Sequence, residues 1–420
     1  MSYLEKLLNG VPVELKPLGE ICDFKNGFAF KSSLFKDDGL PIIRITNVDG
    51  KNINLADVKY FNPIDYSENT KSYEVRNGDI LIAMSGATTG KIGYYTHKEP
   101  AYLNQRVGKF LPKDEILENR YLYHYLLSKT EEIYGISGGG AQPNLSSNAL
   151  MAKLDVPIPC PNNPKKSLEI QQKIVAILDT FSELTAELTA ELTAELTARK
   201  MQYSYYREKL YHFDKNKVQH LPMDDENIGV FQRGKRFVKT DLISEGVPTI
   251  HYGEMYTHYG TWADKTISFV SEKLVNDKNL RLAQKGDVVI VAAGETIEDI
   301  GMGTAWLGEE GVVIHDACFS YKTSLNPKFV AYFTRTKQFH DQIKKHISSG
   351  KISAINARGL GKALIPVPTK EEQERIVSIL DKFDTLTNSI SEALPKEIEL
   401  RKKQYEYYRD LLLTFPNDKK

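Results

Sequence analysis

The sequence contains few cysteines and no long apolar run. Its three cysteines, Cys22, Cys160 and Cys318, are isolated, with no C-x-x-C pair and no histidine spacing typical of zinc sites. This pattern disfavours a disulfide scaffold or a structural metal site and predicts thiols in a reducing cytosol. The longest apolar run, Val288 to Ala293, is far shorter than the ~20 residues that span a membrane. Residues 1–10 also lack the apolar core of a signal peptide. We therefore expect a soluble, cytoplasmic protein without a metal.

An excess of charge of one sign is absent as well. Lys and Arg number 55 and Asp and Glu number 55, so the chain of 420 residues carries no net charge. This balance excludes a polycation that coats nucleic acid through its overall charge, and any DNA contact has to come from local basic patches. The length is sufficient for two globular domains with additional helices.

Proline and glycine are absent between Ser167 and Phe213, where Ala, Glu and Leu dominate. This composition predicts one helix of about 45 residues, about 65 Å long at ~1.5 Å per residue. Its apolar residues follow alternating steps of four and three, the pattern of a helix that packs along another helix. These residues are Ile170, Ile174, Ile177, Phe181, Leu184 and Leu188. The tetrapeptide T-A-E-L then occurs three times between Thr185 and Leu196, and the steps to Leu192 and Leu196 predict local unwinding of the pair.

A second long helix matches the first after a shift of 202 residues. The segment Ile174–Phe181 aligns with Ile376–Phe383, and Arg199–Arg207 aligns with Arg401–Arg409. Pro395 lies inside the second helix and is expected to kink or interrupt it. The segment Tyr3–Leu7 resembles Tyr206–Leu210, as if the chain were a circular arrangement of repeats cut open. Repetition on this scale indicates a duplicated architecture.

The segments between the helices form two blocks of mixed α and β character. In the first block, strands are predicted at Pro41–Ile45, Asp79–Met84 and Val107–Leu111, and helices at Glu118–Lys129 and Ser146–Lys153. The second block repeats the plan 207 or 208 residues later, since Gly27 corresponds to Gly234 and Gly78–Ala83 to Gly286–Val291. The loops between the matched positions differ completely. We therefore predict an α+β fold with two mixed blocks, residues 1–157 and 216–367, and two helical regions, residues 158–215 and 368–420.

The duplicated helices, the paired variable blocks and the T-A-E-L tract resemble the specificity subunit of type I restriction-modification enzymes, and the tetrapeptide points to the type IC group. The resemblance covers the whole chain. It implies that each block is a target recognition domain that reads one half of a split, asymmetric DNA site. It also implies that the two helices pack antiparallel as a ruler and hold two modification subunits.

The same resemblance implies how the chemistry is divided among the subunits of a bacterial, cytoplasmic complex. The modification subunits would bind S-adenosylmethionine and methylate adenine, and restriction subunits would contribute ATP- and magnesium-dependent translocation and cleavage. The specificity chain itself would be non-catalytic and would bind double-stranded DNA without a cofactor, a metal or a membrane.

The motifs of enzymes that act on DNA are missing from the chain. No Asn-Pro-Pro-aromatic tetrapeptide is present, and its nearest match, Asn62-Pro63-Ile64-Asp65, lacks the aromatic platform for a flipped base. The segment Gly86–Ile92 is one residue too short for a phosphate loop and has Ile92 where Ser or Thr binds magnesium, so we expect a turn there.

Candidate DNA contacts lie in the loops that follow the predicted strands. Arg suits guanine edges, Asn and Gln suit adenine, and Lys neutralises phosphate. Gly/Ser/Asn loops at Ser137–Asn144 and Ser348–Asn356 add further donors. Each of these residues could also belong to an ordinary solvated turn, and packing is the simpler expectation for His251, Tyr252, Tyr256, His258 and Tyr259. The candidates are Lys25, Asn26, Lys31, Ser85, Thr88, Lys91, Asn104, Gln105, Arg106 and Gln142 in the first block, and Arg233, Lys235, Arg236, Lys239, Glu295, Thr296, His315 and Lys351 in the second.

The tetrapeptide allows a prediction about spacing, carried by Leu184, Leu188, Leu192 and Leu196. One T-A-E-L unit adds ~6 Å of helix and turns it by about 40° beyond a full revolution. One base pair advances ~3.4 Å and turns by roughly 35°. Because the rotations nearly agree, each tetrapeptide is expected to move one block around the duplex by about one base pair, with helix tilt or DNA bending absorbing the extra rise.

Two other functions are compatible with parts of the sequence. An architectural coiled-coil protein that binds DNA without sequence preference would need similar loops in both blocks, whereas these loops differ. A solitary nuclease or methyltransferase would need the missing motifs. Tyr203, Tyr206 and Tyr407 on the long helices can pack within the chain or dock modification subunits.

Overall fold

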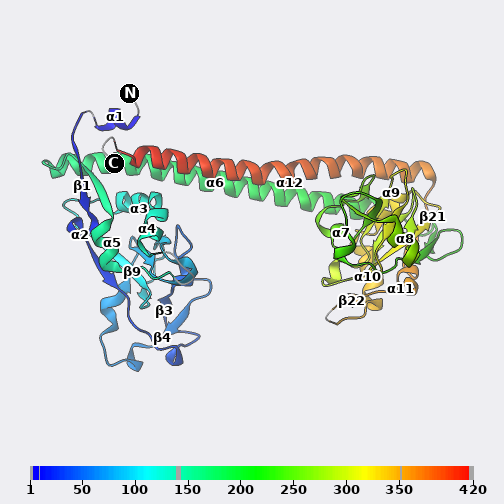
Figure 1. The fold of residues 1–420 in the computed structure, drawn as a ribbon, viewed down its shortest axis with the longest axis horizontal. Coiled ribbons are helices and arrows are strands. Elements are labelled where there is room, and N and C mark those ends of the chain that lie inside the picture. Colours follow the sequence, from blue (N-terminus) through cyan, green and yellow to red (C-terminus); the bar gives the residue numbers. More distant parts are fainter. Residues whose placement is uncertain (1–2, 9, 139–142, 351, 416–420) are drawn as a thin grey trace. The chain divides into compact units, whose positions relative to one another are not determined.

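The structure is a computed structural model that describes residues 3–8, 10–138, 143–350 and 352–415. The chain packs as two compact units (Figure 1). The first unit contains the residues up to Glu191 together with those from Lys396 onward, and the second contains Leu192–Pro395. Each unit therefore combines one of the two α/β blocks with portions of both long helices. The predicted division into four regions, at residues 157, 215 and 367, stays a prediction.

The two long helices are α6, Pro164–Leu210, and α12, Lys370–Leu413. Helix α6 begins where the Asn163 side chain accepts a hydrogen bond from the Lys166 amide at 3.1 Å, with Pro164 at the first helical position. Helix α12 begins where Thr369 accepts one from the Glu372 amide at 3.3 Å. The predicted long helix is confirmed. Helix α12 continues through Pro395 without an interruption, and the kink expected as the alternative stays a prediction. Pro395 is exposed, so water can satisfy the carbonyl that loses its amide partner.

The first block is built from short strands and helices in the order expected from the sequence, although Ile45 falls in a 3-10 turn instead of a strand. The Asn47 side chain turns the backbone there by accepting a hydrogen bond from the Arg44 amide at 2.9 Å. The elements are α1 Tyr3–Leu8, β1 Val13–Pro17, α2 Leu18–Ile21, β2 Cys22–Asn26, β3 Leu40–Ile43, β4 Lys59–Phe61, β5 Glu74–Val75, β6 Ile80–Ala83, β7 Ile92–Tyr94, β8 Ala101–Leu103, β9 Val107–Pro112, α3 Asn119–Ser128, α4 Thr130–Ile136, α5 Ser147–Lys153 and β10 Asp155–Pro159.

The second block repeats this plan with small additions. Its elements are β11 His220–Pro222, β12 Gly229–Arg233, β13 Val247–Ile250, α7 Glu254–Thr257, β14 Trp262–Ala263, β15 Ser268–Val270, α8 Glu272–Lys278, β16 Leu282–Ala283, β17 Val288–Val291, β18 Ala293–Gly294, β19 Gly303–Trp306, β20 Val312–Ile314, β21 Cys318–Thr323, α9 Pro327–Phe333, α10 Lys337–Ile343, β22 Ser353–Ala354, α11 Ala357–Gly361 and β23 Leu364–Pro366.

The strand order demonstrates the duplication. Sheets β2-β9-β6-β7 and β4-β3-β8-β5 of the first block correspond to β12-β21-β17-β19 and β15-β13-β20-β16 of the second. The equivalent pairs β3–β8 and β13–β20 are both parallel, and in the second block β14 also pairs parallel with β19. The second block adds β14 and the pair β18-β22. The two blocks therefore share a scaffold down to strand order and direction.

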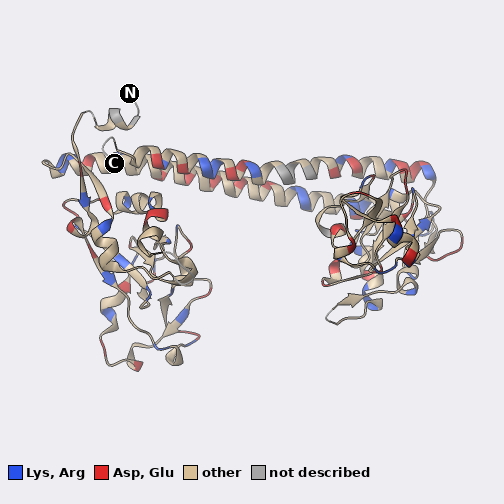
Figure 2. Ribbon diagram, viewed as in Figure 1, with Lys and Arg blue, Asp and Glu red and all other residues tan. Residues whose placement is uncertain are grey.

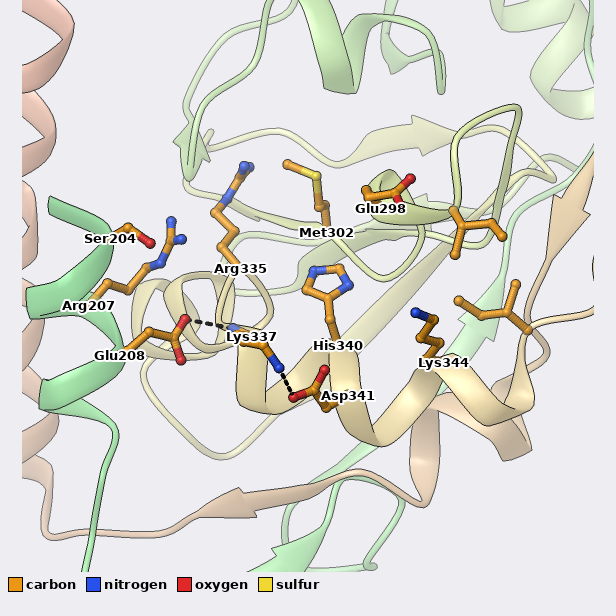
Figure 3. Close-up of a pocket in the computed structure, with 12 residues that line it drawn as sticks. Ser204, Arg207, Glu208, Glu298, Met302, Arg335, Lys337, His340, Asp341 and Lys344 are labelled. Carbon is orange, nitrogen blue, oxygen red and sulfur yellow. Dashed lines mark hydrogen bonds and ion pairs between the residues drawn. The ribbon is translucent and has the colours of Figure 1, made fainter. Parts of the chain in front are cut away.

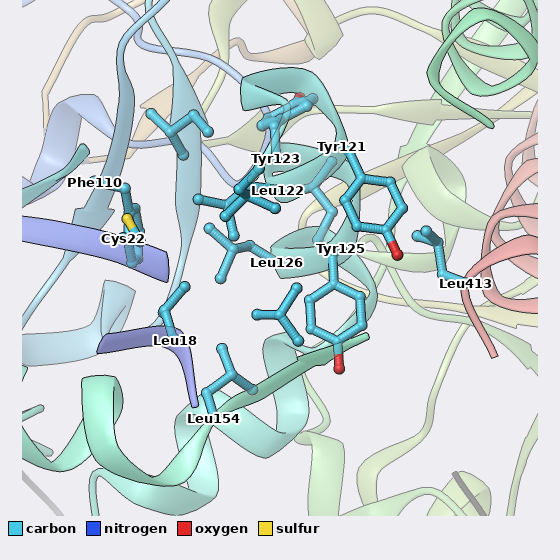
Figure 4. Close-up of a cluster of buried hydrophobic side chains, with 14 of the residues drawn as sticks. Leu18, Cys22, Phe110, Tyr121, Leu122, Tyr123, Tyr125, Leu126, Leu154 and Leu413 are labelled. Atoms are coloured by element: carbon cyan, nitrogen blue, oxygen red, sulfur yellow. The ribbon is translucent and has the colours of Figure 1, made fainter. Parts of the chain in front are cut away.

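Each unit has its own hydrophobic core. In the first unit, Leu18, Phe110, Tyr121, Leu126 and Leu154 pack together with residues of both long helices (Figure 4). The core strands β6 and β17 are buried along their whole length, which explains their continuous apolar sequences. Cys22 and Cys318 are buried thiols as predicted, and burial raises the pKa of each to about 12. Cys160 is half-buried.

The long helices pair antiparallel within each unit through equivalent aromatic contacts. In the first unit, the rings of Phe181 on α6 and Tyr408 on α12 stack with centroids 5.5 Å apart. In the second unit, Tyr206 on α6 stacks on Phe383 on α12 at 5.1 Å. Phe181 and Phe383 are equivalent positions of the duplication, and so are Tyr206 and Tyr408. The same two positions therefore stack in both units. The phenylalanine belongs to α6 in the first unit and to α12 in the second.

The predicted seam is wrong at Leu184, whose side chain is 55% exposed. The bulky Phe181–Tyr408 pair fills the space between the helices one turn earlier. Beside it lies a cavity of about 270 Å³ that Leu184 only borders. The other three leucines of the tetrapeptide tract, Leu188, Leu192 and Leu196, are half-buried. Thr185 and Thr189 donate hydrogen bonds to the carbonyls of Phe181 and Thr185, one turn back, at 2.7 Å each.

Equivalent residues fasten each block to its long helix. Gln171 on α6 accepts a hydrogen bond from the Glu118 amide at 2.9 Å, and Gln373 on α12 accepts one from the Asn326 amide at 2.8 Å. Eight residues after each glutamine, an aspartate binds the same block: Asp179 binds His124 and Asp381 binds Tyr332. These side chains hold α3 and α9 against the long helices in the same way.

The N-terminal helix α1 packs with the C-terminal end of α12. Leu4 and Leu8 are buried in the same cluster as Leu412 and Leu413 of α12. In the second unit, Tyr211, the counterpart of Leu8, is buried after the end of α6. The predicted circular arrangement is confirmed within the first unit, because α1 and the end of α12 pack in one core.

Candidate nucleic-acid interface

Most of the candidate residues of the second block meet at the ends of two parallel strands. Because Ile250 of β13 pairs with Ile314 of β20, the next residues along each strand, His251 and His315, lie side by side with ring centroids 4.9 Å apart. They border a pocket of about 420 Å³ that we name the strand-end pocket. Its lining residues are Arg233, Arg236, Phe237, Val238, Lys239, His251, Tyr252, Ala293, Gly294, Glu295, His315, Asp316, Ala317 and Ile352.

The histidines of this pocket are held neutral and in a defined orientation. His315 lies 3.0 Å from the Phe237 carbonyl through Nε2 and 3.1 Å from the Ala317 amide through Nδ1. A carbonyl can only accept, so Nε2 carries the proton and Nδ1 accepts from the amide. Burial lowers the pKa of His315 despite the neighbouring Asp316 carboxylate, and burial also lowers the pKa of His251. At neutral pH these rings offer hydrogen-bonding edges and flat faces without charge.

Cations surround this neutral centre. Arg233 is fixed by a hydrogen bond from Nε to the Asp316 carbonyl at 2.9 Å, whereas Arg236 and Lys239 are exposed. Glu295 is exposed on the opposite loop. The loop that carries Arg236 and Lys239 passes close to the end of β20 at Gly234, where a Cβ would overlap the His315 carbonyl. The pocket therefore combines guanidinium donors, a carboxylate acceptor and aromatic walls, the groups that recognise base edges and phosphates.

The corresponding strand ends of the first block carry amides. Asn104, Gln105 and Arg106 follow β8 as His315 follows β20, and Gln105 and Arg106 are exposed. Gly27, the counterpart of Gly234, presses against the Asn104 carbonyl in the same way. The scaffold at this position is shared, while the displayed side chains differ.

Other candidates of the first block are engaged within the protein. Ser85 is buried, and Thr88 donates a hydrogen bond to the Ile45 carbonyl at 3.2 Å in the predicted strand-end turn. Ser85 as a DNA contact stays a prediction, although its side chain is buried in this structure. Lys25 lies over the Tyr73 ring at 4.5 Å, and the Asn26 amide donates to Ser147 at 3.5 Å.

The remaining candidates do not line the strand-end pocket. Lys235 donates to the Lys278 carbonyl at 3.3 Å, Thr296 is exposed beside Glu295, Lys31 is exposed and Lys91 is half-buried. Gln142 and Lys351 lie outside the described residues. As DNA contacts, the exposed positions stay predictions.

From the sequence, packing was the simpler expectation for His251 and Tyr252, Asp316 was placed in a polar run with His315, and Ile352 had no role beyond its place in the loop Ser348–Asn356. The signal for His251 was available: it follows a buried strand, as His315 does, and parallel neighbours end at the same sheet edge. Ile352 had no such signal. Its 63% exposed side chain reaches the pocket because β22 pairs with β18.

Charge is mixed on both units. Figure 2 shows Lys and Arg interspersed with Asp and Glu over the blocks and along the long helices. In the part of the chain that the structure describes, no helix is long and apolar enough to cross a membrane. Among the described residues, no group of three His, Cys, Asp or Glu side chains is placed to hold a metal ion.

Comparison with known proteins explains the duplication. The type I restriction modification DNA specificity domain matches the chain twice, over residues 10–198 and 226–400. The chain belongs to this family. The specificity subunit of the type I restriction enzyme EcoR124I/EcoR124II of Escherichia coli is 34% identical over 427 residues, covering 99% of this chain and 98% of that protein. The EcoprrI specificity subunit of the same organism is 28% identical over 93% of this chain and 92% of that one.

Solved structures agree with this assignment at the level of the fold. A chain from a structure of a type I restriction-modification system superposes with a TM-score of 0.69 at 16% identity, covering 96% of this chain and 98% of that one. The HsdS subunit of Thermoanaerobacter tengcongensis gives 0.54 at 16% identity, covering 96% and 97%. The predicted α+β fold of this specificity subunit, with duplicated blocks and long antiparallel helices, is confirmed.

Proposed function

We propose that this type I specificity subunit directs its complex to a bipartite, asymmetric DNA site, with each block reading one half-site. The observation that carries this proposal is that the two blocks share a backbone scaffold but differ in the side chains at the ends of equivalent strands. The two blocks have the same strand order and the same parallel pair, while the residues at equivalent strand ends differ, Asn104-Gln105-Arg106 against His315-Asp316-Ala317. A shared scaffold with different contact groups suits two readers of two sequences.

The chemistry of the strand ends supports reading through base edges. In the second block, Arg236 can donate to guanine, and Glu295 can accept from cytosine. In the first block, Asn104 and Gln105 carry amides that pair with adenine, and Arg106 offers a guanidinium. Lys239 and Lys31 supply charge for phosphate contacts that fix the register on the duplex.

The long helices would set the distance between the half-sites. Helix α6 runs without interruption through all three tetrapeptides. Its leucines are half-buried from Leu188 onward, so the tract is a helical spacer within the chain. Adding or removing a tetrapeptide would leave the residues of both strand-end regions unchanged.

Exposed apolar side chains at duplicated positions support two copies of one partner, which we take to be the modification subunits. Tyr205 is 60% exposed and its counterpart Tyr407 is 64% exposed. Leu184 and its counterpart Leu386 are 55% and 61% exposed. The pairs Tyr205–Tyr206 and Tyr407–Tyr408 also share one geometry, with ring centroids 5.5 Å apart in both. Tyr203, in contrast, packs within the chain, donating to Asp384 at 3.3 Å. Large apolar side chains that are exposed at both duplicated positions indicate that the same kind of surface covers each of them.

In this proposal the chain is non-catalytic, and the chemistry belongs to its partners. S-adenosylmethionine would bind to the modification subunits, and ATP and magnesium to restriction subunits that join the complex on DNA. The contribution of this chain is sequence choice and assembly, and its strand-end residues would bind DNA without forming or breaking bonds.

The test is selection of DNA from a random duplex library by the chain in complex with its modification subunits. The proposal predicts enrichment of two short conserved elements separated by a fixed number of unselected base pairs. Exchanging the strand-end residues 104–106 should alter one element alone. Enrichment of nothing above background by an assembled complex would contradict the proposal and favour an architectural scaffold. A purified chain that cleaves or methylates DNA by itself would contradict its non-catalytic role.

A further inference from the structure

A second cavity of the second unit lies between helix α6 and the recognition block (Figure 3). Its volume is about 430 Å³. It is lined by Ser204, Arg207 and Glu208 of α6, by Ile297, Glu298 and Met302 of the loop after β18, and by Arg335, Lys337, His340, Asp341, Lys344 and Ile347 around α10. None of these residues was among the candidate contacts from the sequence. We name this cavity the α6–α10 pocket.

Two arginines of this pocket have buried donors that lack an acceptor. Within the described residues, Nε of Arg207 and Nε of Arg335 are inaccessible to solvent and have no hydrogen-bond partner. Arg335 is anchored through its other nitrogens, since Nη2 donates to the Gly260 and Gly303 carbonyls at 2.9 and 3.1 Å. Arg207 lies over the Tyr203 ring at 5.4 Å. Buried donors without an acceptor are uncommon, because burial removes water without supplying a replacement. These inaccessible Nε atoms lie behind the guanidinium groups, so only the other nitrogens of the two arginines can reach the pocket.

The carboxylates of the pocket do not fill that role. Asp341 pairs with Lys337, and Glu208 accepts from the Lys337 amide at 2.6 Å (Figure 3). Glu298 is exposed on its loop. Asp384, which faces both arginines, accepts from Tyr203, and burial raises its pKa. Arg207, Arg335 and Lys344 remain as cations directed to the pocket, and burial lowers the pKa of Arg335. Cations grouped in this way can bind an anion that has several oxygens.

The strand-end pocket borders the same two loops. Glu295 lines the strand-end pocket, while Ile297 and Glu298 line the α6–α10 pocket. Likewise Ile352 lines the strand-end pocket and Ile347 lines the α6–α10 pocket. The pairing of β18 with β22 joins the loop of Glu295 to the loop of Ile352. The α6–α10 pocket and the strand-end pocket are therefore lined by neighbouring residues of the same two loops.

We propose that the α6–α10 pocket binds a phosphate of the DNA backbone next to the half-site read by the second block. The inference rests on the proposed function. Arg207, Arg335 and Lys344 would donate to the non-bridging oxygens, as guanidinium and ammonium groups do in phosphate sites. The pocket would hold the strand in register and contribute no sequence preference of its own.

The test compares two double variants that remove the same charge from the chain in complex with its modification subunits. Arg207→Gln/Lys344→Gln removes two pocket cations. Lys209→Gln/Lys345→Gln removes two exposed neighbours that do not line the pocket. Binding to a duplex with the selected site is measured over a series of salt concentrations. Loss of one phosphate contact should make the slope of log K against log salt shallower by about 0.9 for the pocket variant. The control should keep the slope, and both should keep the selected sequence and the melting temperature.

A scan with neutral methylphosphonate linkages identifies the phosphate. One linkage beside the second half-site should weaken binding of the wild-type complex and leave the pocket variant unaffected. Equal salt slopes for pocket variant and control, or a scan without such a linkage, would overturn the proposal. Stabilisation of the chain by inorganic phosphate, with a flat scan, would assign the pocket to a free anion instead. If the wild-type complex selects no sequence at all, the proposed function fails and not the pocket alone.

Discussion

His124 donates a hydrogen bond from Nε2 to the Asp179 carboxylate, 2.7 Å away, and thereby ties α3 of the first block to helix α6. Arg120 binds the same carboxylate. In the second unit, Tyr332 and Lys328 bind Asp381, the counterpart of Asp179, at 2.8 Å each. The carboxylate was retained at both positions while its partners changed. Both units therefore attach the block to the long helix through an aspartate at the same position, although the residues that donate to it differ.

Removing this acceptor should destabilise the first unit. Asp179→Ala leaves the fully buried His124 and the half-buried Arg120 without their partner. We expect a loss of about 2–4 kcal/mol in the free energy of unfolding, measured by chemical denaturation followed by circular dichroism. Glu183→Ala, at an exposed position of the same helix, should change it by less than about 0.5 kcal/mol. Equal effects of the two substitutions would show that the attachment adds nothing.

Acid should destabilise the protein through its buried histidines. Burial lowers the pKa of His124, His251, His315 and His340 in the folded state. Since the unfolded chain binds protons at about pH 6.5, stability should be full above that pH and fall as the pH drops below it. In the pH series of unfolding free energies, His124→Gln should flatten the decline, and His258→Gln, at an exposed site, should not. If the unfolding free energy fell equally steeply with pH in both variants, His124 would not contribute to the acid sensitivity.

The sequence predicted the elements well and their contacts less well. The 202-residue shift located both long helices because their packing is encoded in a regular apolar repeat. The same repeat misplaced Leu184, since a stacked ring pair one turn away decides its exposure. In the second block, Arg233, Arg236, Lys239, Glu295 and His315 line one pocket, although the sequence placed them only in separate segments. Ser85 could not be recognised as buried, and the pocket of Arg207 and Arg335 could not be foreseen, because these depend on residues distant in the chain.

Arg236 should determine part of the second half-site. Arg236→Gln removes an exposed guanidinium at the rim of the strand-end pocket, and we expect about 1–3 kcal/mol less discrimination at one base pair. The measurement is binding of the complex to duplexes that vary each position of the selected site in turn. Lys273→Gln, on the exposed face of α8, is the control and should leave discrimination unchanged. Relaxed choice in both half-sites, or in neither, would contradict the division of labour between blocks.

The duplicated tyrosines should each support one modification subunit. Tyr205→Ser or Tyr407→Ser alone should weaken one of two binding events by about 2 kcal/mol, because aromatic side chains dominate interface energies. Native mass spectrometry at limiting concentration should then show complexes with a single modification subunit, and the double variant should show few complexes of any kind. Lys173→Ser, exposed on α6, serves as the control. Full assembly of the double variant would exclude these patches as docking sites.

The tetrapeptide tract should control spacing and nothing else. Deleting residues 189–192, one T-A-E-L unit, shortens α6 by about 6 Å and rotates the remainder of the helix by about 40°. We expect the selected site to lose about one base pair of spacer, with both half-sites unchanged. Thr189→Ala/Glu191→Gln, which alters the same tetrapeptide at constant length, should keep the spacer. A change in the half-site bases after the deletion would refute the ruler.

The most direct measurement is the methylome of cells that express this chain with its modification subunit, obtained by long-read sequencing. The account predicts adenine methylation at one bipartite, asymmetric motif with a spacer of fixed length. Methylation at a single contiguous motif would mean that only one block reads DNA. An assembled complex that leaves the genome unmethylated would contradict the account.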